Sequence, residues 1–251
     1  MCVLFFALDQ HPRYRLVFAA NRDEAYARPT APSAWWDECP GVLAGRDLNA
    51  GGTWMGVTRT GRWTALTNVR DVQAHHEGAQ SRGDLTRAFL CGGEAAEQYA
   101  ARVFAERARY NPFNLLVGDG EAVWTVSSHT EAPERLAPGV YGLSNATLQV
   151  PWPKVTRGLA AFEQALAVEK PEPEAFFEFL RDETRAPDEV LPETGVGRAW
   201  ERVLSPLFIT SADYGTRASM VLLLDAEGSG AFVERTFAPG TLAATTRTFD
   251  F

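Results

Sequence analysis

Cys2 is the first residue whose type and position could support catalysis. It follows the initiator Met1, and a second residue this small normally allows an aminopeptidase to remove Met1. The new α-amine would have a pKa of about 7.7–8.0 and could accept the thiol proton, so nucleophile and base would share one residue. The alternative is that Cys2 is a small apolar residue at the start of a core strand.

Four polar residues, Asn21 to Glu24, follow the apolar stretch LVFAA. That stretch and the first apolar segment of the chain are typical of two strands in a hairpin, whose pairing can bring the polar residues back beside Cys2. Side chains alternate in an extended chain, so Asn21 and Asp23 would share one face of the strand. Arg22 and Glu24 would share the other. The alternative is a solvent-exposed turn, because buried polar groups need hydrogen-bond partners.

Two asparagines, Asn68 in WTALTN and Asn145 in YGLSNA, lie where a predicted strand gives way to a loop. A side-chain amide at such a place could donate a hydrogen bond to the oxyanion that forms during amide cleavage. An Asx turn that closes the strand is the alternative for each residue. Both asparagines are therefore candidates for transition-state stabilisation.

A glycine-rich segment and an arginine complete the set of candidates. Gly52 and Thr53 could let a ligand approach the backbone closely, or could form a bend before a strand. Trp54 could line an apolar pocket, although most aromatic side chains belong to the core. Arg217 in YGTRAS could support the site or form a surface ion pair.

The composition excludes several classes of function. A formal net charge of −8 and a pI of about 5.1 leave no basic surface for a nucleic-acid backbone. No apolar run is long enough for a transmembrane segment, and no pair of histidines has the i, i+4 spacing of a metalloprotease metal site. Three cysteines without a CxxC pair predict neither a disulfide framework nor a zinc site. We therefore expect a reducing compartment, with the cytoplasm as the default.

The elements that must position these residues run in the order strands, helices, strands, helices, strands. This order lacks the alternation of a doubly wound parallel sheet and favours an α+β fold with two antiparallel sheets covered by helices. No repeat or long linker divides the chain, so residues 1–251 are predicted to form a single domain. Residues 28–40 contain three prolines and are predicted to form a loop. Strands are predicted at 2–8, 15–21, 53–59, 63–69, 113–119, 121–127, 140–145, 217–226 and 231–238, and helices from residues 84 and 95 and over 154–167 and 172–183.

Several motifs, spread in order along nearly the whole chain, resemble the NRDE family, also called the transport and Golgi organisation 2 family. The matching segments are the initial MC, AANRDE, GGTWMGVT, TNVRD, SRG, NPFNLLVGD, YGLSNA, PWPKV and YGTRASMVLLL. The resemblance implies an N-terminal-nucleophile (Ntn) hydrolase-like fold, a four-layer αββα sandwich of two antiparallel sheets covered by helices.

The NRDE family is more distantly similar to N-terminal-cysteine amidohydrolases such as bile salt hydrolase and penicillin V acylase. Those enzymes carry an RNxD motif after their first hairpin, and residues 20–23 of this chain match it as Ala20, Asn21, Arg22 and Asp23. The aspartate is kept, whereas the arginine is replaced by Ala20. Strand alternation directs Arg22 away from the face of Asp23, so Arg22 is not expected to replace the missing arginine unless the backbone bulges.

The same resemblance implies roles for the other candidates. Asp23 would orient the terminal amine and the thiol, and Arg217 would support the site. Asn68 and Asn145 would donate to the oxyanion. These four residues, with Cys2, form the predicted catalytic set; Asn21, Arg22, Gly52, Thr53 and Trp54 are the candidates for the substrate pocket.

Two functions remain open from the sequence. In the first, Cys2 hydrolyses a linear amide or related acyl bond of a small hydrophobic or acyl metabolite, and no external cofactor is required. In the second, the pocket binds or traffics haem, or an acyl-CoA or lipid metabolite, without chemistry. Cys2, Asp23, Asn68 and Asn145 favour the first function, and the missing RNxD arginine favours the second.

Overall fold

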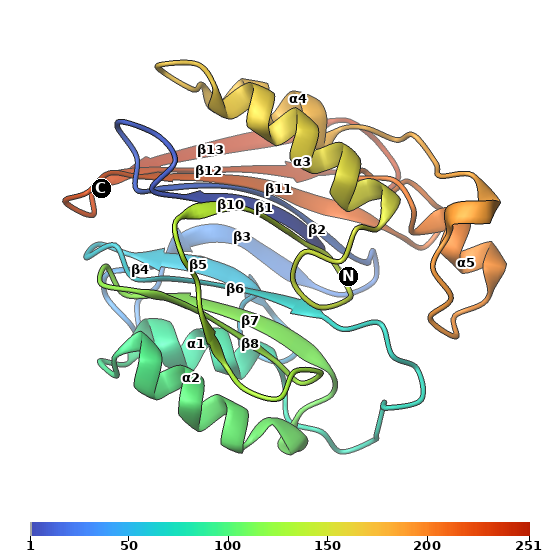
Figure 1. Ribbon diagram of the computed structural model, residues 1–251, viewed down its shortest axis with the longest axis horizontal. Helices are drawn as coiled ribbons and strands as arrows, with labels where there is room; N and C mark the ends of the chain where they lie inside the picture. Colours follow the sequence, from blue (N-terminus) through green and yellow to red (C-terminus); the bar gives the residue numbers. More distant parts are fainter. Residues whose placement is uncertain (1) are drawn as a thin grey trace. The chain divides into compact units, whose positions relative to one another are not determined.

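The apolar segment after Met1 forms the first strand of a six-stranded antiparallel sheet in the computed structural model, which describes residues 2–251 (Figure 1). Strands β1 (Cys2–Leu8) and β2 (Leu16–Ala25) pair as the predicted hairpin, with Leu8 opposite Leu16 at the turn. The order in this sheet is β10-β1-β2-β11-β12-β13. Its other strands are β10 (Gly139–Leu143), β11 (Tyr214–Leu224), β12 (Gly230–Phe237) and β13 (Ala244–Asp250).

Helices α3 (Pro153–Leu166) and α4 (Pro173–Leu180) cover one face of this sheet. Alternation along β1 directs Val3, Phe5 and Ala7 into their shared core. Packing is close: a Cβ added at Gly158 of α3 would lie 2.0 Å from the ring of Phe5. A shorter helix, α5 (Arg198–Val203), precedes β11.

The second sheet has seven antiparallel strands that follow one another in chain order from β3 to β9. Helices α1 (Gly83–Cys91) and α2 (Ala96–Ala105) pack on it around Phe89, Tyr99 and Phe113. The strands are β3 (Thr30–Trp35), β4 (Val42–Asp47), β5 (Met55–Thr58), β6 (Trp63–Asn68), β7 (Phe113–Gly118), β8 (Val123–Ser127) and β9 (Glu134–Arg135).

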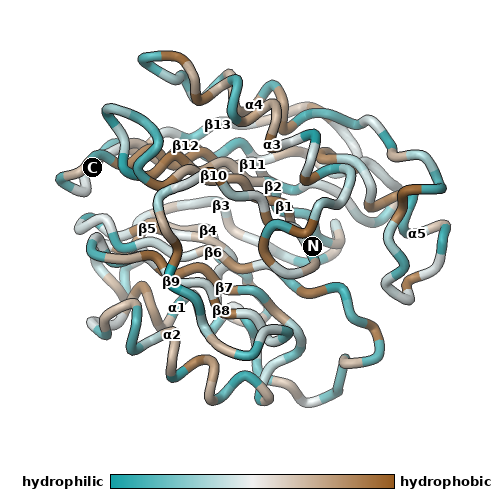
Figure 2. The backbone as a smooth tube through the Cα atoms, viewed as in Figure 1, coloured by the Kyte–Doolittle hydropathy of each residue, from teal (hydrophilic) through white to brown (hydrophobic). Residues whose placement is uncertain are grey.

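Each sheet is the centre of one compact unit. The first unit comprises Met1–Ala27, Pro138–Ala226 and Gly230–Phe251, and the second comprises Arg28–Ala137 and Glu227–Ser229. Hydrophobic residues are concentrated in the strands of both units (Figure 2). The predicted α+β class, with two antiparallel sheets and their helices, is confirmed. The expectation of a single domain stays a prediction. No helix within residues 2–251 has the length and hydrophobicity needed to cross a membrane.

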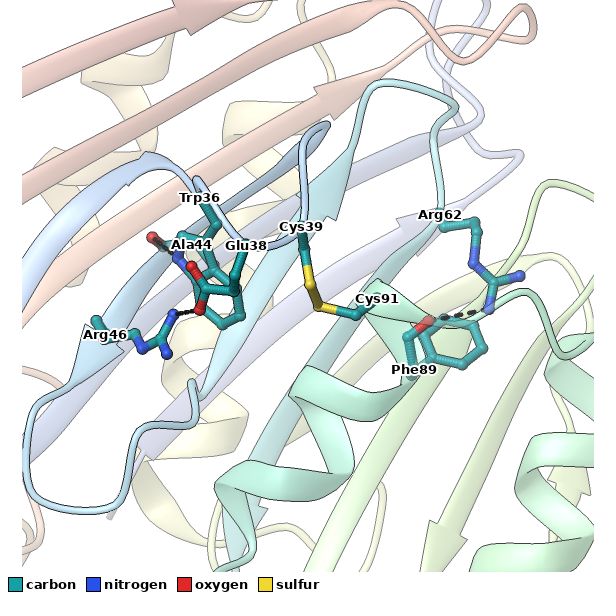
Figure 3. The surroundings of a disulfide bond; sticks show 8 residues. All are labelled: Trp36, Glu38, Cys39, Ala44, Arg46, Arg62, Phe89 and Cys91. Carbon is teal, nitrogen blue, oxygen red and sulfur yellow. Dashed lines mark hydrogen bonds and ion pairs between the residues drawn. A yellow bond between two sulfur atoms is a disulfide. The ribbon is translucent and has the colours of Figure 1, made fainter.

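Two sequence-based predictions were wrong in the second unit. Residues 28–40 contain strand β3, where Pro32 is tolerated because β3 is an edge strand whose register with β4 shifts between Ala31 and Ala34. The expectation that the cysteines form no disulfide is also wrong, because Cys39 and Cys91 are joined with their Cα atoms 5.6 Å apart (Figure 3).

The disulfide ties the turn before β4 to the end of α1. Arg62 holds the same helix end, because its guanidinium donates to the carbonyl of Phe89 at 3.1 Å (Figure 3). It also donates to the carbonyl of Glu94, just beyond the helix, at 2.9 Å. The cysteines are 52 residues apart, so their pairing depends on how the strands and α1 fold. Cysteine number and spacing alone did not reveal it.

Candidate active site

Cys2 opens β1 and is the cysteine left outside the disulfide. Two neighbouring strands flank it within the first unit. On one side β2 places Arg22 directly opposite Cys2. On the other side, the hydroxyl of Ser144, just after β10, donates to the carbonyl oxygen of Cys2 at 3.2 Å and to Oδ1 of Asn145 at 3.3 Å. The structure therefore brings the predicted nucleophile and the predicted oxyanion donor Asn145 to one end of the sheet.

The side chains at this end divide between the two faces of the sheet. Residues directly opposite each other on antiparallel strands point to the same side. The pair Val3 and Asn21 lies on the face covered by α3 and α4, where Val3 belongs to the core. The adjacent pair, Cys2 and Arg22, therefore lies on the opposite face.

Asn21 is fully buried and holds chain segments together. Its side-chain amide donates to the carbonyls of Leu180 (2.8 Å) and Leu207 (2.9 Å), and its Oδ1 accepts from the hydroxyl of Ser219 (2.5 Å). These bonds fix the end of α4 and the segment before β11 against the sheet. The side-chain amide of Asn21, which was predicted as a substrate-pocket candidate, thus makes structural hydrogen bonds.

The pKa of the Cys2 thiol is raised above its ordinary value, mainly because burial penalises the thiolate. The negative charge of Asp23 raises it further, whereas the positive charge of Arg22 and a hydrogen bond to the backbone of Asp23 lower it. Attack by the sulfur at neutral pH therefore requires a proton acceptor and a cation that stabilises the thiolate.

Asp23 is buried at the point where β2 meets β11. Its Oδ1 accepts a hydrogen bond from the hydroxyl of Thr216 at 2.7 Å, and Thr216 is its partner in the strand register. Burial raises the pKa of the Asp23 carboxyl, while the charge of Lys154 is the largest influence in the other direction. Burial therefore favours the protonated form of Asp23, whereas the charge of Lys154 favours the ionised form.

Lys154 is a residue that the sequence reasoning missed. It lies in the first turn of α3 and is only 2% exposed. The pattern did contain a signal, because Lys154 begins the buried stripe that continues with Gly158, Phe162 and Leu166 at intervals of four residues. A lysine on the apolar stripe of a helix indicates a buried charge with an anionic partner.

Arg217 lies at a bulge in β11, where the register against β2 shifts between Thr216 and Ala218. Its guanidinium donates to the carbonyls of Ala25 (3.1 Å) and Tyr26 (3.2 Å). Arg217 therefore fixes the chain just after Asp23, which agrees with a supporting role. Its part in chemistry stays a prediction.

The remaining candidates belong to the second unit. Asn68 ends β6 opposite Phe113, and its proposed bond to an oxyanion stays a prediction. The close backbone approach expected at Gly52 is made to α1, since an added Cβ would lie 2.4 Å from the carbonyl carbon of Gly83. The carbonyl of Thr53 accepts from the hydroxyl of Thr86 (2.6 Å).

Trp54 is 8% exposed, and its ring lies against Gly45, where an added Cβ would be 2.4 Å from the indole. The contacts of the 52–54 segment are thus with its own sheet and helix, and its role in a substrate pocket stays a prediction. Among residues 2–251, no group of three or more His, Cys, Asp or Glu side chains could hold a metal ion.

Comparison with known proteins agrees with this arrangement. A family model described as transport and Golgi organisation 2 matches residues 1–239. The transport and Golgi organization protein 2 homologs of Bos taurus and Homo sapiens are 36% and 34% identical to this chain. The matches cover 94% of this chain and 92% of the bovine protein, and 100% of this chain and 99% of the human protein.

Among solved structures, the chain is similar to a conjugated bile acid hydrolase from Clostridium perfringens. The TM-score is 0.52 at 12% sequence identity, over 99% of this chain and 92% of that one. At this identity the likeness concerns the fold, and it confirms the expected Ntn-hydrolase-like architecture. The match of the family model and the two homologs, over nearly the full length, establishes that the chain belongs to the transport and Golgi organisation 2 family.

Proposed function

We propose that the protein is an N-terminal-cysteine hydrolase that cleaves a linear amide or a related acyl bond. The observation that carries the proposal is the position of Cys2, which begins a strand between Arg22 on one side and the Ser144–Asn145 segment on the other. The fold is similar to that of a conjugated bile acid hydrolase, which adds support at the level of architecture.

In the proposed reaction, removal of Met1 leaves Cys2 with a free α-amine. The amine takes the thiol proton, and the sulfur attacks the carbonyl carbon of the substrate to give a tetrahedral oxyanion. The amide of Asn145 donates to this oxyanion. The intermediate collapses as the amine returns the proton to the leaving nitrogen, and a thioester remains on Cys2. Water then attacks the thioester, releasing the carboxylic acid and restoring the thiol.

Asp23 would orient the amine in this scheme. Its carboxyl is one residue beyond the cross-strand partner of Cys2, and its position is fixed by Thr216 and influenced by Lys154. A carboxylate in such a place accepts a hydrogen bond from the amine and sets its direction. The reaction needs no external cofactor.

Two measurements test the proposal. Intact mass of the purified protein should lack the initiator methionine, and a panel of acyl-amides should include a substrate whose turnover falls at least about 1,000-fold in Cys2→Ala. The double variant Cys39→Ser/Cys91→Ser serves as the matched control, because it changes the other two cysteines and should keep turnover. Full turnover by Cys2→Ala would eliminate the assignment of the nucleophile.

The alternative proposal is non-enzymatic binding or trafficking of haem, or of an acyl-CoA or lipid metabolite. It predicts that Cys2→Ala changes ligand binding little, unless the thiolate ligates haem iron. Titration of haem and acyl-CoA with both proteins separates the two proposals. A location in the cytoplasm is likewise a proposal, and the Cys39–Cys91 disulfide is the reason to test it by fractionation, since disulfides are rare in that compartment.

A further inference from the structure

Arg22 and Cys2 form a cross-strand pair in the first unit. They lie directly opposite each other on β1 and β2, so their side chains leave the sheet on the same face. Arg22 is 4% exposed, so its guanidinium, which stays charged at any physiological pH, lies in a largely dry environment. A buried cation next to a cysteine favours the thiolate.

The strand register shows where Ala20, which replaces the RNxD arginine, and Arg22 lie relative to Cys2. Ala20 lies opposite Leu4, one cross-strand step further from Cys2 on the same face. Arg22 does point away from the face of Asp23, as alternation requires. The face of Asp23 is the one covered by α3 and α4, whereas the Cys2 thiol lies on the same face as Arg22.

An anionic side chain fixes the direction of Arg22. Its Nη2 lies 3.7 Å from Oε2 of Glu24, which is two residues further along the same strand and therefore on the same face. The side chain of Glu24 is 31% exposed, so this ion pair bridges the buried site and solvent. The ion pair with Glu24 thus offsets part of the positive charge of Arg22.

Other groups that act on the thiol come from neighbouring elements. On β2 the Asp23 carboxylate opposes the thiolate, and Lys154 of α3 and Thr216 of β11 act on that carboxylate. The segment after β10 contributes uncharged Ser144 and Asn145. Among the side chains named here, Arg22 is the one whose charge and register both favour the thiolate; under the proposed function a protonated α-amine on Cys2 would act in the same direction.

We infer that Arg22 is the positioning residue for the Cys2 thiolate. Arg22 belongs to the same-face cross-strand pair next to that of Ala20, and it takes the role of the RNxD arginine that Ala20 replaces. The part of the inference that concerns turnover rests on the proposed hydrolase function. The part that concerns the sulfur does not, because thiolate formation is measured by alkylation alone.

The test is the pH dependence of Cys2 alkylation by iodoacetamide, followed by peptide mass mapping on the full-length protein. Arg22→Gln should slow alkylation about tenfold at neutral pH, with rates rejoining the wild type at high pH. Arg22→Lys, which keeps the charge, should stay within about threefold of the wild type. Arg13→Gln, at the exposed turn of the same hairpin, is the matched control and should leave the profile unchanged.

A second variant keeps the test decisive if Arg22→Gln does not fold. Glu24→Gln removes the anion beside Arg22, and we expect Cys2 alkylation to become about two to five times faster at neutral pH. A purely structural role for the ion pair predicts no such acceleration. An unchanged profile in Arg22→Gln, or slower alkylation in Glu24→Gln, would overturn the inference.

The two proposals fail in different ways. If Cys2→Ala retains amide turnover, the hydrolase proposal fails, while the alkylation profiles still report on Arg22. If turnover depends on Cys2 but alkylation and kcat are the same in Arg22→Gln as in the wild type, the inference about Arg22 fails alone.

Discussion

At the scale of single residues, the charges near Cys2 divide between the two faces of one sheet. Arg22 shares the face of the thiol, whereas Asp23 accepts from Thr216 and is influenced by Lys154. This division separates the cation that favours the thiolate from the carboxylate assigned to the amine. Two predictions concern the buried carboxylate and its lysine.

The first prediction concerns the pH dependence of stability. Burial raises the pKa of Asp23 above its ordinary value of 3.8, so the folded protein holds this proton more tightly than the unfolded chain does. The resulting stabilisation is fully present below the unfolded-state pKa and is lost as pH rises through the folded-state pKa. Asp23→Asn cannot ionise and should lack this loss. Urea unfolding at several pH values should show that the free energy of unfolding of the variant rises relative to that of the wild type as pH increases. A difference that does not change with pH would contradict this prediction.

The second prediction concerns Lys154. Lys154 is the buried cation whose charge favours the ionised form of Asp23, so Lys154→Met leaves that carboxyl without this compensation and should lower the free energy of unfolding by about 3 kcal/mol. Lys170, the other lysine of the chain, is exposed, and Lys170→Met should change stability by less than about 0.5 kcal/mol. In combination with Asp23→Asn, the loss from Lys154→Met should shrink; strictly additive losses would show that the two residues are not coupled.

At the scale of elements, the disulfide links the β3–β4 turn to the end of α1. It closes a loop of 52 residues, and chain entropy alone predicts a stabilisation of about 4 kcal/mol, with measured values commonly about 2–4 kcal/mol. Cys39→Ser/Cys91→Ser should therefore lower the free energy of unfolding within that range. Without reductant, mass-mapped labelling of the native protein should modify Cys2 alone. Labelling of Cys91 under these conditions would argue that the bond is not formed.

At the scale of the whole molecule, the candidate catalytic residues come from both compact units. Cys2, Asp23, Asn145 and Arg217 belong to the first, and Asn68 belongs to the second. The first four are tied to one sheet by register and hydrogen bonds. The role of Asn68 is a prediction that kinetics can test.

Each asparagine, if it donates to the oxyanion, should stabilise the transition state more than the bound substrate. Asn145→Ala and Asn68→Ala should then lower kcat by about 10²–10³ and leave KM nearly unchanged. Asn49→Ala, at an exposed turn of the second unit, is the control and should keep wild-type kinetics. A loss confined to Asn145→Ala would remove Asn68 from the catalytic set.

The sequence by itself determined the hairpins, the α+β class, and the positions of Cys2 at a strand end and of Asn145 just after one. These features depend on local alternation, turn residues and short motifs, which are legible without tertiary contacts. The tertiary structure alone decided that Cys39 and Cys91 pair, since that contact spans 52 residues. It also decided that Lys154 is buried and that Arg22 lies opposite Cys2 in the strand register. Alternation tells which side chains of one strand share a face, but only the register between strands tells which residue of the next strand they meet.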